Sequence, residues 1–247
     1  MAHKLRVGAV SYLNTKPLIY GFEQGMMKTD IDLVIDYPAK IAGLLQNNGI
    51  DIGLVPVAVI PSLKEYHIMS DFCIGCDGEV ASVCLFSEVP LPEIKTIILD
   101  YQSKTSVALL QILLNDHWKI SPEIITGKEN YELGISGTTA GLIIGDRALT
   151  QRSKSTFVFD LGLAWKEMTG LPFVFAAWVA NKEMTADFIA DFNAANALGL
   201  KNLPIIKEQN PFDDFDLGQY YDQYISFRLD EEKKKGLALF LSMLTKG

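Results

Sequence analysis

The stretch VGAVSYLNTKPLIYG, residues 7–21, shows the pattern of strand, polar corner and helix with which each half of the chain opens. Its apolar start predicts a strand, and Pro17 predicts the first turn of a helix, where the missing N–H of proline costs nothing. Between the two lie five side chains that can hydrogen-bond: Ser11, Tyr12, Asn14, Thr15 and Lys16. The stretch therefore predicts a strand that passes through a polar corner into a helix, which is typical of α/β folds.

Strand and helix signals alternate along the rest of the chain. Apolar runs predict strands over residues 31–38, 50–60, 67–76, 80–89, 94–101, 122–126, 140–146, 156–162 and 171–181. Helical spacing of apolar residues, with Gly170 as one stop signal, predicts helices over 39–49, 104–118, 163–170, 185–200, 216–229 and 230–247. We therefore expect an α/β protein.

The alternation restarts halfway along the 247 residues, which predicts two α/β lobes. Two extended crossings, near residues 84–90 and 173–181, are expected to join them. One lobe is expected to comprise residues 1–85 and 178–247, and the other residues 86–177. A cleft between two lobes is the default place for a ligand.

Charge and hydropathy narrow the range of partners. The 22 basic and 30 acidic residues give a net charge of −8, which argues against nucleic acid. The sequence has no apolar run of the ~18 residues that a membrane-spanning helix needs, and its first residues lack the apolar core of a secretion signal. We expect a cytoplasmic protein without a membrane partner. A homodimer is compatible with the sequence.

The cysteines and the known cofactor motifs indicate neither metal nor cofactor. Cys73, Cys76 and Cys84 are odd in number and are expected to be reduced thiols. Cys73 and Cys76 form a C-x-x-C, but no second pair of ligands accompanies them, which disfavours a zinc or redox site. Motifs for nucleotide phosphates, dinucleotides and serine nucleophiles are absent from the sequence, so we expect no cofactor.

Two further polar corners follow predicted strands, at the edge where ligands collect in α/β sheets. Ser103, Thr105 and Ser106 stand at the start of the helix over 104–118. Since a plain helix cap needs one hydroxyl, three of them favour a binding site. Gly145 and Asp146, followed by Arg147, end the strand over 140–146, and the glycine allows close approach of the backbone to a ligand.

Two isolated residues complete the candidate set, and several candidates have simpler structural interpretations. Ser82 lies in a crossing strand, and Pro56 lies where the run over 50–60 turns. A lone strand serine is usually structural. The side chains of Asn14, Thr15 and Asp146 are also suited to cap helices, and Arg147 is also suited to contact with water.

Six motifs in register carry a resemblance to a known family. They are VGAVSYLNTKPL (7–18), DIGLVPV (51–57), CIGCDGEVASVCLFS (73–87), SKTSVALL (103–110), GLIIGDRAL (141–149) and DLGLAWKEMTGLPFVFAAW (160–178). Together they resemble the chorismate dehydratase family of the futalosine route to menaquinone. The resemblance runs from about residue 5 to 180 and is weaker over the C-terminal helices.

The resemblance implies a fold and a reaction. The fold is that of type II periplasmic binding proteins, with two mixed sheets flanked by helices and a ligand cleft between the lobes. The reaction is the dehydration of chorismate to 3-[(1-carboxyvinyl)oxy]benzoate, in which the C4 hydroxyl and the C3 hydrogen leave and the ring becomes aromatic.

The implied site uses the residues singled out above. Thr105 and Ser106 would bind a carboxylate, with Ser11 and Tyr12 on the opposite wall. Asn14 and Ser82 would position the enolpyruvyl ether and the C3–C4 edge. Pro56, Gly145 and Asp146 complete the binding residues. The base would be a carboxylate, either that of Asp146 or one on the substrate.

Two alternatives remain open. The sister family, the 1,4-dihydroxy-6-naphthoate synthases, resembles this chain but has a histidine in the strand that matches GLIIGD, where this chain has Gly145. The third interpretation is a non-catalytic cytoplasmic protein that binds a small acid, and the fold alone does not distinguish it from an enzyme.

Overall fold

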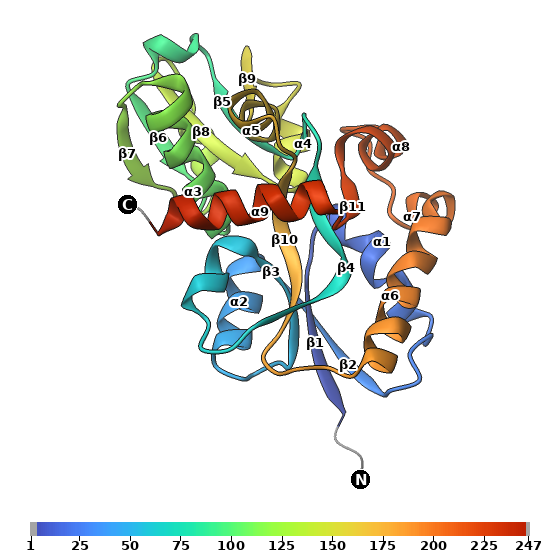
Figure 1. Cartoon of the computed structure of the whole chain (residues 1–247). Coiled ribbons are helices and arrows are strands. Elements are labelled where there is room, and N and C mark those ends of the chain that lie inside the picture. Colours follow the sequence, from blue (N-terminus) through green and yellow to red (C-terminus); the bar gives the residue numbers. More distant parts are fainter. Residues whose placement is uncertain (1–3, 246–247) are drawn as a thin grey trace.

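The chain forms two separate β-sheets, one in the lower half and one in the upper half of Figure 1. This computed structural model describes residues 4–245. The first sheet has the order β11-β4-β10-β3-β1-β2, and the second has the order β7-β6-β8-β5-β9. We call the first sheet with its helices the first lobe, and the second sheet with its helices the second lobe.

Strands of both directions occur in each sheet. The first sheet is formed by β1 (Leu5–Val10), β2 (Ile31–Asp36), β3 (Ile52–Pro56), β4 (His67–Cys76), β10 (Phe173–Ala180) and β11 (Ser226–Arg228). The second is formed by β5 (Val83–Ser87), β6 (Thr96–Leu99), β7 (Glu123–Thr126), β8 (Thr139–Ile144) and β9 (Phe157–Asp160). β1 runs parallel to β2 and β3, whereas β10 is antiparallel to β3 and β4. In the second sheet, β6 is parallel to β7 and β8, and β5 is antiparallel to β8 and β9.

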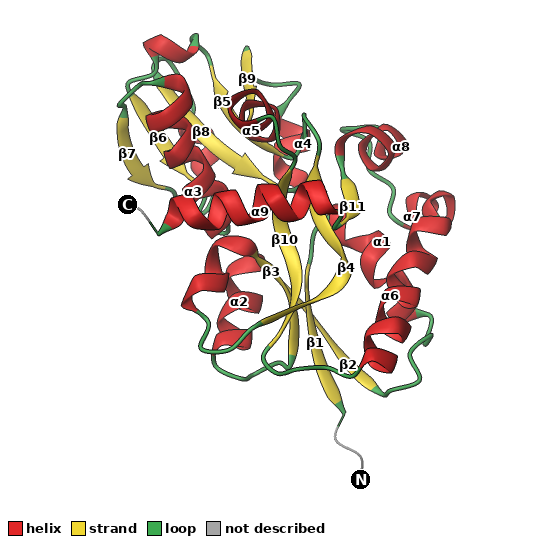
Figure 2. Ribbon diagram, viewed as in Figure 1, coloured by secondary structure: helices red, strands yellow, loops and turns green. Residues whose placement is uncertain are grey.

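Helices flank both sheets (Figure 2). The first lobe carries α1 (Lys16–Glu23), α2 (Pro38–Gln46), α6 (Ala186–Lys201), α7 (Leu203–Gln209), α8 (Leu217–Gln219) and α9 (Glu231–Leu244). The second carries α3 (Lys104–Ile112), α4 (Asp146–Gln151) and α5 (Leu161–Thr169). Within residues 4–245, no helix is both long and apolar enough to cross a membrane.

The predicted alternation of strands and helices is confirmed, with local corrections. Gly170 ends α5 in the left-handed conformation, as its place after the helical pattern predicted. The turn predicted at Pro56 in the run over 50–60 is confirmed, since β3 ends at Pro56 and the chain continues as a short 3-10 helix. The helix predicted over 216–229 is wrong at its end, because residues 226–228 form β11 against the edge of β4.

The chain passes between the lobes twice. It leaves the first sheet after β4 and returns to it at β10, so the predicted lobe boundaries at 85/86 and 177/178 fall within β5 and β10. One apolar core spans both passages. Trp165 of α5 packs edge-on against Phe173 of β10 and Phe240 of α9, with ring centroids 5.1 and 6.1 Å away.

A close helix crossing fixes α1, whose N-terminus forms the first polar corner. α1 packs on α6 at Gly21 and Gly199. A Cβ atom on Gly199 would lie 1.7 Å from the backbone oxygen of Pro17, and one on Gly21 would lie 2.2 Å from that of Ala195. Only glycine allows the two helices to approach this closely.

Candidate functional site

A cleft between the two sheets is lined by both lobes. The space between its walls is about 430 Å³, part of which is open solvent. Its apolar lining includes Val10, Pro56, Ile74, Val83, Ile144 and Phe175. Its polar lining comes from Tyr12, Asn14, Ser103, Ser106 and the backbone at Gly145. Three of the predicted polar corners therefore meet at one cavity.

The first corner presents Tyr12 and Asn14 to the cleft. Residues 13–15 form a single 3-10 turn between β1 and α1, which buries Asn14 and leaves Ser11 exposed outside the cleft lining. The capping alternative is wrong here, because neither Asn14 nor Thr15 caps α1 with its side chain in the described structure. Asn14 instead lines the cleft, and its Oδ1 accepts the Thr15 hydroxyl at 3.4 Å.

The three hydroxyl groups of the second corner do not all face the cleft. Ser103 caps α3, since its Oγ accepts the Ser106 N–H at 3.1 Å, and it donates to the Ser106 Oγ at 2.9 Å. The Thr105 Oγ1 accepts the N–H of Ala58 from the first lobe at 3.1 Å. Ser103 and Ser106 line the cleft, whereas Thr105 holds the two lobes together and lies outside the lining.

The third corner joins the lobes at Gly145 and Asp146. Gly145 has a φ of 64°, and a Cβ there would lie 2.9 Å from the Tyr12 ring, so the ring packs directly on the backbone. The Asp146 carboxylate accepts the N–H of Leu13 at 3.0 Å instead of capping α4. Burial raises the pKa of Asp146 to about 6, although the Leu13 N–H and Lys16 act in the opposite direction.

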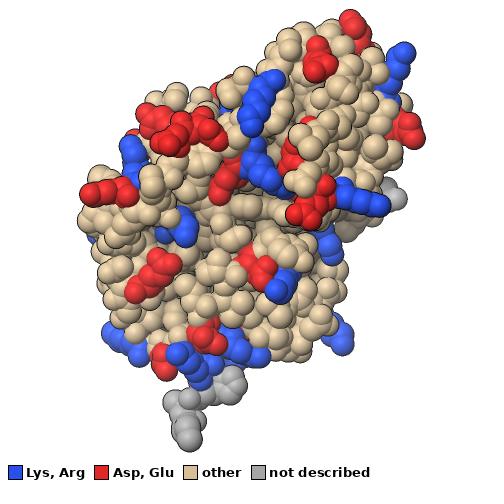
Figure 3. Space-filling model, turned by 180° about the vertical axis from the view of Figure 1, so that it is seen from behind, with Lys and Arg blue, Asp and Glu red and all other residues tan. Residues whose placement is uncertain are grey.

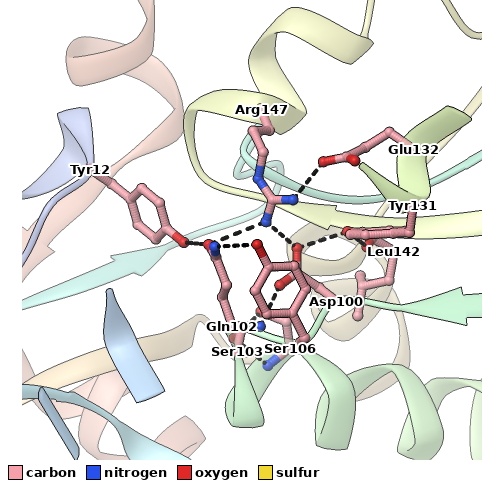
Figure 4. A network of polar contacts seen from close by, with 10 residues as sticks. Tyr12, Asp100, Gln102, Ser103, Ser106, Tyr131, Glu132, Leu142 and Arg147 are labelled. Carbon is pink, nitrogen blue, oxygen red and sulfur yellow. Dashed lines mark hydrogen bonds and ion pairs between the residues drawn. The ribbon is translucent and has the colours of Figure 1, made fainter. Parts of the chain in front are cut away.

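Arg147 is held in a polar network behind the cleft (Figure 4). Its guanidinium pairs with Asp100 at 2.6 Å and with Glu132 at 2.5 Å, and it lies 5.8 and 5.7 Å from the ring centroids of Tyr101 and Tyr131. The alternative that Arg147 is merely solvated is therefore wrong. Burial raises the pKa of Asp100, and Arg147 lowers it.

The network reaches the cleft through Gln102. The Oε1 of Gln102 accepts the Tyr12 hydroxyl at 2.5 Å and the Arg147 Nη2 at 3.2 Å (Figure 4). Burial, and secondarily the charge of Asp100, raises the pKa of Tyr12, so the hydroxyl stays protonated and donates. Because Tyr12 belongs to the first lobe and Gln102 to the second, this hydrogen bond links the two lobes beside the cleft.

The fourth candidate, Ser82, lies behind the cleft wall. It is fully buried, its Oγ accepts the Tyr220 hydroxyl at 2.7 Å, and its carbonyl accepts the Gly145 N–H at 2.8 Å. Burial raises the pKa of Tyr220, while contacts with Ser82 and Asn14 lower it. Tyr220 therefore connects the two residues predicted to position the substrate.

Sequence reasoning did not identify Tyr220 or Gln102 as parts of the site. Tyr220 lies in the sequence among other tyrosines with no distinguishing pattern, and Gln102 precedes the three hydroxyl residues of the second corner without a motif of its own. The only available signal was position, since Gln102 lies in the short segment between β6 and α3, at the carboxyl edge of the second sheet.

The cysteines and the surface charges have no direct part in the cleft. Cys73, Cys76 and Cys84 are buried free thiols, and burial raises the pKa of Cys73 to about 12. In residues 4–245, no group of three or more side chains is arranged to bind a metal ion. Basic and acidic side chains are interspersed over the face seen in Figure 3. The described residues that line the cleft carry no charged side chain, so attraction of an anion would depend on nearby groups such as the N-terminus of α3.

Comparison with known proteins agrees with this architecture. A protein of Archaeoglobus fulgidus has a TM-score of 0.78 at 15% identity, with 99% of this chain and 97% of that chain covered. The CA3427 gene product of Candida albicans, described as having the generic periplasmic binding protein fold, has a TM-score of 0.68 at 12% identity, with 99% and 91% covered. The aliphatic sulphonate binding protein SsuA of Escherichia coli has a TM-score of 0.64 at 14% identity, with 100% and 88% covered. The predicted periplasmic-binding-protein-like fold is confirmed.

The sequence comparisons are more specific. A chorismate dehydratase of Thermus thermophilus is 29% identical over 236 residues, which cover 84% of each chain. Residues 5–246 match the sequence model of the family described as menaquinone biosynthesis. Since this match spans almost the whole chain, the chain belongs to the menaquinone biosynthesis family.

Proposed function

We propose that this protein is a chorismate dehydratase, which converts chorismate to 3-[(1-carboxyvinyl)oxy]benzoate and water in the futalosine route to menaquinone. The observation that carries the proposal is the 29% identity to the Thermus thermophilus chorismate dehydratase over 84% of both chains. The cleft between the lobes supports it, because its lining combines apolar side chains with a few hydroxyl and amide groups, as sites for small organic ligands do.

The reaction makes modest chemical demands. Loss of the C4 hydroxyl with the C3 hydrogen leaves an aromatic ring, which supplies a large driving force. The enzyme must therefore orient the substrate, provide for removal of one proton and assist departure of the hydroxyl group. Hydrogen-bonding side chains on rigid elements are sufficient for these tasks.

The cleft offers groups for each task. Ser103 and Ser106 at the N-terminus of α3 would receive one substrate carboxylate, since hydroxyl and backbone N–H groups there favour an anion. On the opposite wall, Asn14 would bind the reacting part of the substrate, and Tyr12 and Pro56 would enclose the ring. We assign Ser82 to the same reacting edge, where it would act through the Tyr220 hydroxyl and the Gly145 N–H that it binds. Thr105 would hold the two lobes together through the Ala58 N–H. Ser11 would remain at the exposed corner, outside the cleft lining.

The proton acceptor follows from the surroundings of Asp146. Its carboxylate is engaged with the Leu13 N–H and lies outside the cleft lining. Of the two carboxylates considered, we therefore favour the one on the substrate as the base. Asp146→Asn is then expected to retain most of the turnover, whereas Asn14→Leu is expected to lower it by about 100-fold, since misplacement of a substrate commonly has effects of this size.

An ultraviolet time course of the purified protein with chorismate tests the proposal. Loss of the diene absorbance, with identification of a 3-substituted benzoate by mass spectrometry, is the expected result. Calorimetric binding of chorismate without its consumption would favour the non-catalytic binding protein. If chorismate is neither bound nor consumed, the proposal is contradicted. Activity on the substrate of the sister synthases would then be examined.

A further inference from the structure

The residue before Ser82 has a strained backbone. Ala81 is fully buried and has a φ of 61°, which residues other than glycine rarely adopt. The Ser82 N–H donates to the Val80 carbonyl at 2.7 Å. Together these features form a γ-turn with positive φ at its central residue, a rare and strained conformation. Such strain persists only where the surrounding structure over-determines it, and it clusters at functional sites.

The carboxylate of Asp160 holds this turn from the second lobe. Its Oδ2 accepts the Ala81 N–H at 2.8 Å, and both of its oxygens lie 3.1 Å from the Val80 nitrogen. Its Oδ1 also caps α5 through the N–H groups of Gly162 and Leu163. One buried side chain therefore ties the crossing between the sheets to the start of a helix.

Arg152 of the second lobe secures the other side of the turn. Its Nη1 donates to the Ala81 carbonyl at 3.3 Å and lies 3.9 Å from the Asp160 Oδ2. Both backbone polar groups of Ala81 are thus bound by charged side chains. Charge-assisted hydrogen bonds of this kind are stronger than neutral ones, which suits them to hold a strained residue.

The turn determines where Ser82 lies. With the turn fixed, the Ser82 Oγ meets the Tyr220 hydroxyl, and the Ser82 carbonyl meets the N–H of Gly145 on the cleft wall. A change of φ at Ala81 would move both groups of Ser82 together, because they follow directly in the chain.

We propose that Asp160, assisted by Arg152, is a positioning residue that holds Ala81 in its strained turn and thereby fixes Ser82 against Tyr220 and the cleft wall. The proposal rests on the proposed function, in which Ser82 acts at the reacting edge of the substrate. It adds to that function a device in the crossing segment that aligns the site.

Asp160→Asn tests the proposal, with Asp51→Asn as a matched control. Asp51 is also buried, accepts a backbone N–H, that of Arg6, at 2.9 Å and pairs with an arginine, but it precedes β3, at the opposite end of that strand from Pro56 in the cleft lining. Two quantities are measured: hydrogen exchange at the Val80 and Ala81 amides, and kcat and KM for chorismate. In Asp160→Asn we expect exchange at least about tenfold faster and kcat about 100-fold lower with KM changed by less than about threefold. Asp51→Asn should change neither.

The outcomes separate this inference from the proposed function. Fast exchange at Val80 and Ala81 with unchanged kcat would overturn the positioning role, as would exchange that stays slow in Asp160→Asn. If that variant does not fold, Arg152→Met decides, because the Arg152 side chain is 23% exposed and its replacement leaves the core intact. It should give the same pattern at smaller size, and Arg152→Lys should restore part of kcat. A wild-type protein that does not consume chorismate would contradict the proposed function, while the exchange measurement would still report whether Asp160 holds the turn.

Discussion

The carboxylate that joins Leu13 to the second lobe should make stability depend on pH. Asp146→Asn keeps the size of the side chain and removes its ionisation. In the folded protein the pKa of Asp146 is about 6, compared with an ordinary value of 3.8, because burial disfavours the charged form. Since each unit of pKa corresponds to 1.36 kcal/mol, the difference amounts to about 3 kcal/mol.

The sign follows from proton binding. Between pH 4 and 6 the folded state retains the proton that the unfolded state has already lost, so this group lowers the free energy of unfolding as pH rises through that window. About 2 kcal/mol of the effect should fall between pH 4.5 and 7.5. The Asn variant lacks the effect, so its stability relative to the wild type should improve with rising pH.

Thermal unfolding at a series of pH values measures this difference. We expect the Tm of Asp146→Asn, relative to wild type, to rise by about 4–8 °C between pH 4.5 and 7.5, given about 2–4 °C per kcal/mol for a chain of this size. Asp32→Asn, at an exposed position of β2, serves as the control and should show no such rise. A difference between wild type and Asp146→Asn that is independent of pH, or that becomes smaller as pH rises, would refute the reasoning.

Three further predictions concern closure, packing and the thiols. Tyr12→Phe removes the 2.5 Å hydrogen bond to Gln102, worth about 1 kcal/mol, so the KM for chorismate should rise about fivefold. Gln102→Met should raise the KM little further when it is added to Tyr12→Phe, and fully additive effects of the two substitutions would argue against the bond. Gly199→Ala should lower the free energy of unfolding by about 1–3 kcal/mol because its Cβ would meet a backbone oxygen, whereas Gly43→Ala, with open space around it in α2, should be neutral or stabilising in denaturant titrations. A chromogenic disulfide reagent should react slowly with the native protein and with three thiols after unfolding, and a fast native reaction would contradict the burial of Cys73, Cys76 and Cys84.

Local patterns in the sequence were sufficient to predict most of the fold. The polar corner before Pro17 leads from β1 into α1, and Gly170 ends α5, because both features depend on residues close in the chain. β11 was missed for the opposite reason. A strand of three residues is too short to show a period, and it exists because β4 offers an unpaired edge.

The candidate site divides in the same way. Tyr12, Asn14, Pro56, Ser106 and Gly145 all line the cleft, because the ends of the strands that carry them meet between the two sheets. Other members depend on partners distant in sequence and could not be predicted from local pattern. Tyr220 binds Ser82, which lies 138 residues away in the sequence. Thr105 binds the N–H of Ala58, 47 residues away, and does not line the cleft.

The order of strands in the first sheet has a consequence for how the chain folds during synthesis. β10 pairs with β3 on one side and β4 on the other, so the sheet is incomplete until residues 173–180 have emerged from the ribosome. The second sheet uses only strands between residues 83 and 160, and all its pairings are available earlier. Contacts of lower sequence separation form faster. The second lobe is therefore expected to fold first and to deliver β10 to the gap between β3 and β4. A nascent chain stopped before β10 should expose to chaperones an unpaired edge of β3 and a β4 strand that lacks both of its neighbours, β10 and β11.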